Sequence, residues 1–354
     1  MSRVPTMPIG QTGSNPPSVN GPLQALRCLL GRRSVQLVLA GWVLANVLIP
    51  LTAQGKVIFD RPLLVDETYL DQMLAADVAI AEALVLIGII TLLTRRRVQP
   101  DLIARLPALS VTARETTTLI VYGVLVQLGG ISLGQLLGFN GFSFHLAGTI
   151  YGTHRDVEPI EAVIWAAWNV TVYALIPFLI ARRRYSATQL NLRSVDRRND
   201  ALVVVVVLAI ESVAQLAAFG GTIFDLSGRQ ALLGVPLSFA LYFSGTVLPT
   251  MIFVQCLLVP RYLALTRSIP ATVVLGGVTY AALHGYDSWM VFAGPGDIIL
   301  SVCFLLLLYV APGMLKTWLT LRTGNAWVHV WAYHAIAPHV IADTPHIVQI
   351  FRIR

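Results

Sequence analysis

The chain has 354 residues, of which 56% are hydrophobic and only 12% are charged, and its formal net charge is +7. Because a soluble domain carries about 25% charged residues, this composition excludes an ordinary water-soluble globular protein. Several segments exceed the ~18 apolar residues that a bilayer crossing needs. We therefore predict an all-α, polytopic integral membrane protein.

Residues 1–33 form the predicted N-terminal tail. Pro, Gly, Ser and Asn dominate residues 1–24, which contain no apolar core of a cleavable signal, so we expect a disordered cytoplasmic tail. Nine apolar segments follow, and each is predicted to be a membrane-spanning helix. They lie at residues 34–53, 72–94, 115–138, 160–181, 200–220, 235–258, 269–285, 297–316 and 326–342.

The basic residues orient these helices. Nineteen of the 25 lysines and arginines, Lys316 among them, fall in the tail and in the loops on its side of the membrane. Cytoplasmic loops hold the excess of positive charge, so we predict an N-terminus inside and a C-terminus outside. The runs Arg95–Arg97 and Arg182–Arg184 are expected to contact anionic lipid. Because the positive charge is accounted for by the orientation of the helices, we expect no nucleic-acid partner. The preference for arginine over lysine suggests a bacterial protein, so the expected location is a bacterial cytoplasmic membrane.

A polar, basic linker at residues 182–199 divides the chain into two halves. We predict a four-helix membrane half at 34–181, a five-helix half at 200–342 and a C-terminal tail at 343–354. In the first half, Gly130, Gly134 and Gly138 form a row of small residues that lets another helix approach closely. Packing within the chain is the first interpretation of this row, and a homodimer is the second.

Charged side chains inside predicted helices are the first candidates for function, because such groups are costly at membrane depth. Glu211 lies midway along its helix. It is either protonated and hydrogen-bonded to a neighbouring helix, or a functional carboxylate. Glu82 lies in the second helix, and Asp77 is close enough to a helix end to reach the interface. The loop 139–159, with His145 and His154, is interpreted as an aromatic loop in the headgroup region. A substrate lid or a docking surface is the alternative.

Two predicted helices, the seventh and the last, carry histidines that are candidates for function. His284 ends the seventh helix, and Asp287 is its candidate hydrogen-bond partner. The last helix holds His329, His334 and His339, and steps of five residues turn an α-helix by about 140°. On that geometry the three histidines cannot share a face, which excludes a metal site made by all three. We expect His334 to lie deepest and the other two to be interfacial.

These segments resemble the CAAX prenyl protease and bacteriocin-processing (CPBP, or Abi) family over roughly residues 235–340. That family has an aromatic-x-x-x-His motif, a Thr-Gly-small-Trp turn and a last helix bearing His-x-x-x-Asn. Tyr280 and His284 match the first motif, the sequence from Leu321 to Trp327 matches the turn, and His334 matches the last histidine. The resemblance implies a CPBP-like helical core at 200–342 and an intramembrane protease site.

The chain departs from the family at the remaining motif positions. Active members carry Glu-Glu-x-x-x-Arg on the preceding helix, where a glutamate activates water. Here Pro249 and Thr250 stand at the glutamate positions, Val254 at the arginine position and Pro338 at the closing asparagine. Threonine cannot act as a general base near neutral pH, and losing such a base forfeits a factor of about 10²–10⁴.

Three functions remain open. The first expectation is a catalytically degenerate, CPBP-like accessory or binding subunit of a membrane complex. The second is an active intramembrane peptidase with a peptide substrate, in which His284, His334 and the substitute base Glu211 are catalytic. The third is a transporter or lipid-handling protein in which Glu82, Glu211 and the histidines line a proton-coupled path. We predict no cofactor and no metal, because no third ligand is evident beside His284 and His334. The expected partners are the bilayer and a membrane protein or a second copy.

Overall fold

The computed structural model describes residues 28–53, 68–147 and 157–354. The tail at 1–24 and His154 lie outside these residues. The described part is helical without named strands, and Leu192 and Asn325 form an isolated β-bridge. The predicted all-α class is confirmed for this part of the chain.

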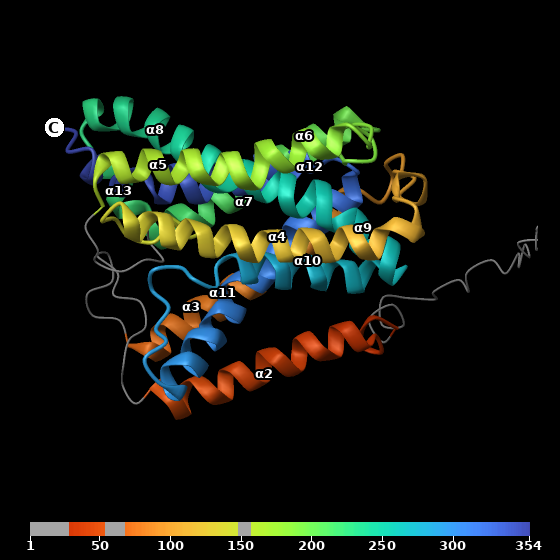
Figure 1. Cartoon of the computed structure of the whole chain (residues 1–354), viewed down its shortest axis with the longest axis horizontal. Helices are drawn as coiled ribbons and strands as arrows, with labels where there is room; N and C mark the ends of the chain where they lie inside the picture. The colour runs from red at the N-terminus through yellow and green to blue at the C-terminus, as the bar shows by residue number, and fades with distance from the viewer. Residues whose placement is uncertain (1–27, 54–67, 148–156) are drawn as a thin grey trace, which may run out of the picture.

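The helices follow one another in the order shown in Figure 1. They are α2 (Arg33–Ala53), α3 (Tyr69–Leu93), the short 3₁₀ turn η1 (Ile103–Arg105), α4 (Leu109–Leu136), α5 (Pro159–Asn169) with η2 (Val170–Leu175) and α6 (Ile176–Arg182), α7 (Arg197–Phe224), α8 (Gly228–Tyr242) with η3 (Phe243–Val247), η4 (Thr250–Leu258) and α9 (Val259–Thr266), α10 (Ile269–Leu283), α11 (Pro295–Thr323), and α12 (Ala326–His329) with η5 (Val330–His334), η6 (Ala337–Ala342) and α13 (Thr344–Ile350). Except for η1, the η segments are π-helical turns within longer helices.

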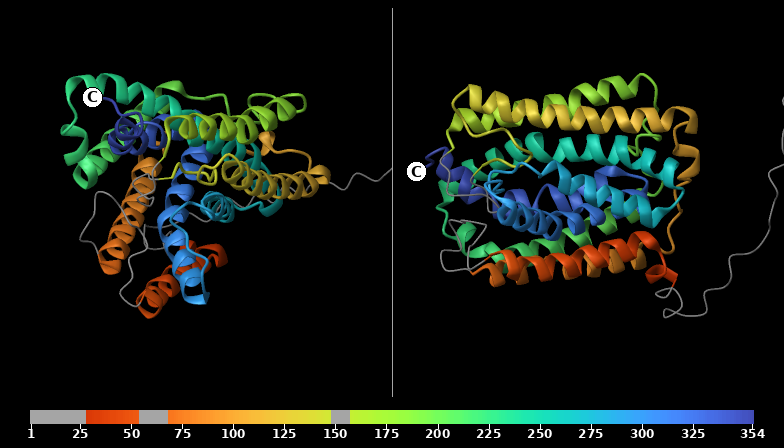
Figure 2. Two further views of the ribbon diagram at one scale, coloured as in Figure 1. Left: turned by 60° about the vertical axis from the view of Figure 1, so that its left-hand side comes forward. Right: turned by 60° about the horizontal axis from the view of Figure 1, so that its bottom comes forward.

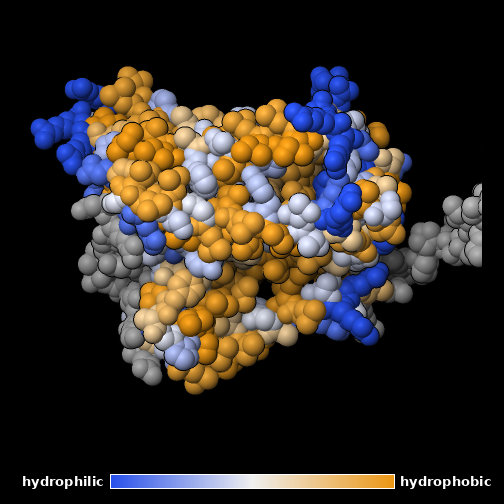
Figure 3. All heavy atoms as spheres, in the orientation of Figure 1, coloured by the Kyte–Doolittle hydropathy of each residue, from blue (hydrophilic) through white to orange (hydrophobic). Residues whose placement is uncertain are grey.

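Seven helical segments of the described chain are long and apolar enough to cross a membrane: Arg33–Ala53, Tyr69–Leu93, Leu109–Leu136, Pro159–Arg182, Arg197–Ala218, Gly228–Thr266 and Pro295–Thr323. The helix Ile269–Leu283 is apolar but shorter. Many large apolar side chains on these helices are exposed, as Leu37, Leu51 and Leu92 are. Figure 3 shows the resulting apolar surface between polar groups gathered at opposite ends of the molecule. This distribution is that of a membrane-embedded helical protein.

Helix α11 is the central packing element. It contacts α10, α3 and α2, and it appears in blue beside α2 and α3 in the lower half of Figure 1. Gly277 of α10 and Gly313 of α11 bring the two backbones together, since a Cβ on Gly313 would lie 2.9 Å from the Cα of Gly277. The views in Figure 2 show α2 as the outermost helix on this side.

The length of α11 corrects the expected role of Lys316. The predicted helix ended at residue 316, but α11 continues to Thr323, so Lys316 is buried (1% exposed) and is not in a loop. Arg97 is also not a lipid contact. It lies inside the protein, where its Nη1 is 2.7 Å from Oδ1 of Asp200, while Arg95 and Arg96 are exposed.

One further prediction is corrected at the C-terminal end, while the glycine row packs within the chain, as in its first interpretation. The segment 343–354, predicted to be a tail, contains the helix α13. Thr344, Ile347 and Val348 lie at helical spacing on one face of this helix, and their side chains are buried. The row of glycines on α4 packs mainly against the loop that follows α4, and less against another helix. A Cβ on Gly130 would meet the Phe142 carbonyl oxygen and the Trp168 ring, and one on Gly134 would meet residues 140–142. Gly138 has a positive φ of 77° in the turn after α4.

Candidate functional site

The last helical segment holds three histidines on one face. The backbone N–H of Ala335 donates to the carbonyl of Val330, and that of Ile341 to the carbonyl of Ile336, which is the i to i+5 pattern of a π-helix. Residues five apart are therefore neighbours. The ring centroids of His329 and His334 are 6.0 Å apart, and those of His334 and His339 are 5.2 Å apart. The α-helical prediction that the three cannot share a face is wrong for this reason.

The same geometry corrects the expected depth of these residues. His329 is 0% and His339 is 4% exposed, so both side chains, like that of His334, lie inside the protein and not at its surface. His339 is held by Asp343, whose carboxylate accepts a hydrogen bond of 2.9 Å from Nδ1. Its ring also stacks on Tyr242, with centroids 4.8 Å apart.

The segment Phe142–Ala147, predicted to be an interfacial loop, lies inside the protein and not at its surface. Side chains from α5 and η3 donate hydrogen bonds to its backbone carbonyls, as the backbone of a buried loop requires. Trp165 Nε1 and Asn169 Nδ2 donate to the Ser143 carbonyl, and Thr246 Oγ1 donates to the Phe144 carbonyl. Because these hydrogen bonds hold the loop in place, His145 lies beside His284 and His339 of the C-terminal half.

His145 meets His284 and Asp287 at the end of α10. The centroids of the two imidazoles are 4.2 Å apart. Asp287 Oδ2 lies 2.9 Å from Nδ1 of His284 and 3.3 Å from Nδ1 of His145. The expected contact between His284 and Asp287 is thus confirmed. Burial alone would raise the pKa of the Asp287 carboxyl, but the adjacent His284 and His145 hold that pKa below its usual range.

Tyr280 stands between His284 and His334, the pair singled out in the sequence. Its ring centroid is 4.7 Å from that of His284 and 6.0 Å from that of His334, and its hydroxyl lies 3.5 Å from Nε2 of His334. Together with the contact of His145 to His339, at 6.1 Å between centroids, this joins five of the seven histidines in one buried cluster: His145, His284, His329, His334 and His339.

A small cavity of about 80 Å³ opens beside this cluster. Its walls include Glu211 and His334 together with His145, His339 and Lys316. The volume has room for a few water molecules. Among the described residues no hydrogen-bond partner is present for Oε2 of Glu211, Nδ1 of His334 or Nε2 of His339. Buried polar atoms of this kind are costly when unpaired, so the cavity suits water or a polar ligand.

A second carboxyl group, that of Glu82 from α3, is a close neighbour of Glu211, although Glu82 does not line the cavity. Glu211 also accepts a hydrogen bond of 3.0 Å from Gln215. Two neighbouring carboxyl groups away from water favour a state in which they hold one proton between them. Lys316 is the neighbouring basic side chain, and its Nζ lies 3.6 Å from the centroid of the Tyr280 ring.

The positions aligned with the glutamates and the arginine of the CPBP motif are buried here and carry no acidic or basic side chain. Pro249, Thr250 and Val254 belong to the buried interior around η4, and within the described residues the Thr250 hydroxyl has no hydrogen-bond partner. Pro338 lines the cavity. Asp77 accepts hydrogen bonds from Trp42 and Asn46 and is not among the residues lining the cavity.

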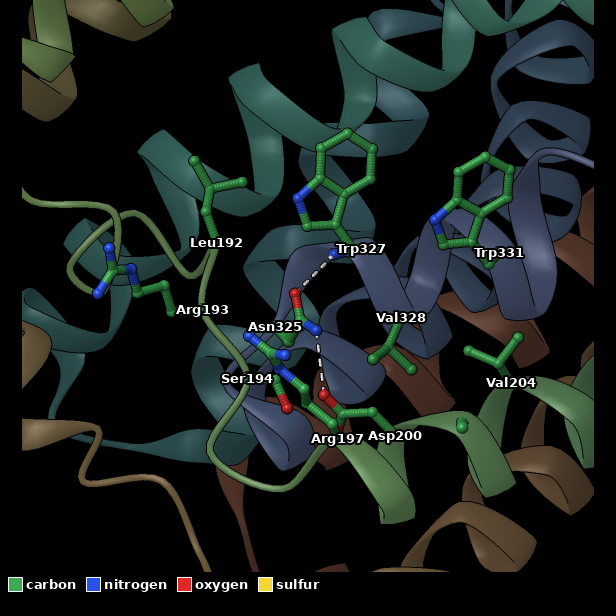
Figure 4. Close-up of a pocket in the computed structure, with 11 residues that line it drawn as sticks. Leu192, Arg193, Ser194, Arg197, Asp200, Val204, Asn325, Trp327, Val328 and Trp331 are labelled. Carbon is green, nitrogen blue, oxygen red and sulfur yellow. Dashed lines mark hydrogen bonds between the residues drawn. The ribbon is translucent and has the colours of Figure 1, made fainter.

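A second, larger cavity of about 700 Å³ borders the linker and the turn after α11. Figure 4 shows Arg193 and Arg197 on one side and the Trp327 and Trp331 rings on another. Asn325 organises the turn, because its side chain accepts from Trp327 N and donates to Asp200. The linings of the two cavities have no residue in common.

The sequence pattern indicates His284, His334 and Glu211 as site residues, but it does not predict that His145, Lys316 and His339 lie beside them. His145 is 139 residues before His284, so no local pattern links them. The regular spacing of five between His329, His334 and His339 was a usable signal of π-helical geometry. Comparison with known proteins finds no matching family model, curated protein or solved structure.

Proposed function

We propose that this chain is a membrane-embedded hydrolase in which the Glu82–Glu211 carboxyl pair activates a water molecule beside His334. The observation that carries the proposal is that Glu211 and His334 line the same water-sized cavity. A base must lie within hydrogen-bond reach of the proton it takes, or one water away. Glu211 would then supply the carboxylate that Pro249 and Thr250 do not.

The proposed reaction is hydrolysis of an amide bond of a membrane peptide. The carboxyl pair with its shared proton retains one negative charge and accepts a proton from water. The hydroxide adds to the carbonyl carbon, and Lys316 and the histidines stabilise the oxyanion. The proton then passes to the leaving nitrogen as the carbon–nitrogen bond breaks, which gives an acid and an amine. In this proposal the fold is CPBP-like, with nine crossings in a bacterial cytoplasmic membrane.

Replacing Glu211 by glutamine tests this proposal. The amide keeps the shape of the side chain but cannot accept the proton, so we expect cleavage to fall by about 10²–10⁴. The readout is the set of new peptide N-termini in the membrane fraction of cells producing the wild type or E211Q, determined by mass spectrometry.

Asp77→Asn is the matched control, because Asp77 is also a carboxylate on a membrane helix but does not line the cavity. It should leave the wild-type pattern unchanged. Elution as one peak in mild detergent establishes that each variant is folded. A folded E211Q protein that produces the wild-type N-termini would contradict the mechanism.

A catalytically inactive binding subunit is the second candidate, and the size of the cavity favours it. A volume of about 80 Å³ holds water but no peptide, so a hydrolase would need the cavity to widen and a binding subunit would not. This candidate predicts a stoichiometric membrane-protein partner after purification in mild detergent. A single component of about 38.5 kDa plus detergent, measured by light scattering, would refute it.

A further inference from the structure

We propose that His145, His284 and Asp287 form a binding site for a divalent transition-metal ion, with Zn²⁺ as the best-matched ion. One nitrogen of each histidine and one carboxylate oxygen lie within 4.8 Å of one another, and all three residues are buried. This site is separate from the water-activating pair Glu82–Glu211, and the inference does not rest on the proposed hydrolase.

Two of the three distances between the ligand atoms match those around such an ion, and the third is no longer than 4.8 Å. Zinc lies 2.0–2.2 Å from nitrogen and oxygen ligands, which puts neighbouring ligand atoms about 3–3.5 Å apart in a tetrahedron. Asp287 Oδ2 is 2.9 Å from His284 Nδ1 and 3.3 Å from His145 Nδ1. The Tyr309 hydroxyl lies 3.3 Å from that oxygen and 3.3 Å from His145 Nδ1. Two imidazole nitrogens and one phenol oxygen therefore lie within 3.3 Å of Asp287 Oδ2.

The surroundings of these atoms hold them in place. The other carboxylate oxygen of Asp287 accepts a hydrogen bond of 3.2 Å from the backbone N–H of His145, which leaves Oδ2 for the histidines. The His284 ring stacks on Tyr309, with centroids 3.9 Å apart, and meets the edge of Phe144 at 5.1 Å. These contacts fix the orientation of the His284 ring and of the Asp287 carboxylate.

The donor set selects the class of ion. Two imidazoles and one carboxylate suit Zn²⁺ and Fe²⁺, while Mg²⁺ and Ca²⁺ prefer oxygen ligands alone. His145 and Tyr309 also line the cavity. A fourth position on the ion would therefore face the space that Glu211 and His334 border, and the ion would carry a bound water there.

Metal content is the direct test. The full chain, purified in mild detergent without an added chelator or a histidine tag, should carry about one zinc or iron ion per chain by mass spectrometry of the elements. After removal of the metal, Co²⁺ alone should restore occupancy and give the intense visible bands of a tetrahedral site. Less than a tenth of an ion per chain, with no Co²⁺ bands on reloading, would show that the four groups form only a hydrogen-bonded network.

Substitutions assign the ligands. Asp287→Asn keeps the size of the side chain but removes its charge, and we expect metal affinity to fall at least about tenfold. His329→Gln is the matched control, since His329 is a buried histidine of the cluster outside the three ligands, and its metal content should equal the wild type. An affinity for Co²⁺ that D287N leaves unchanged would overturn the assignment. If D287N does not fold, the Co²⁺ spectrum of the wild type still decides the question.

Discussion

At the scale of single residues, Arg97 shows how strongly a buried charge depends on one partner. Its guanidinium donates to Oδ1 of Asp200 at 2.7 Å and to the Thr323 carbonyl at 3.2 Å. Removing one member of a buried ion pair costs about 3–5 kcal/mol, because the other charge is left unpaired. We expect Asp200→Ala to lower the free energy of unfolding by about this amount, measured by thermal unfolding in detergent.

The exposed Arg96 provides the control, and Arg96→Ala should change the free energy of unfolding by less than about 0.5 kcal/mol. Replacing Arg97 by methionine together with Asp200→Ala should recover much of the loss, since no unpaired charge then remains. Equal stability of the D200A and R96A variants would show that the ion pair does not stabilise this end of α3.

At the scale of elements, the sequence predicts contacts between residues that are close in the chain and within regular helices. The contact of His284 with Asp287 spans three residues at a helix end, so it followed from the sequence. The shared face of His329, His334 and His339 did not follow, because the expected α-helix turns five residues through about 140°, whereas the π-helical turns bring them together. The buried loop bearing His145 depends on hydrogen bonds from Trp165, Asn169 and Thr246, more than 20 residues away.

At the scale of the whole molecule, the orientation in the membrane follows from charge. Arg97, Arg105, Arg261 and Lys316 are buried, so we leave them out of the count of loop charges. The remaining basic residues are still in excess on the side of the linker 182–199. Cytoplasmic loops carry that excess, so we predict that Ser186 faces the cytoplasm and that Ser227, beyond α7, faces outward.

Single cysteines at these two exposed serines measure the orientation. In a background with Cys28→Ser, which removes the exposed native thiol while Cys256 and Cys303 stay buried, a membrane-impermeant maleimide should label S227C in intact cells. It should label S186C only after the membrane is opened. The two positions are matched because both are exposed serines that flank α7, a single apolar segment. The reverse pattern would invert the topology, and equal labelling in intact cells would show that α7 does not cross the membrane.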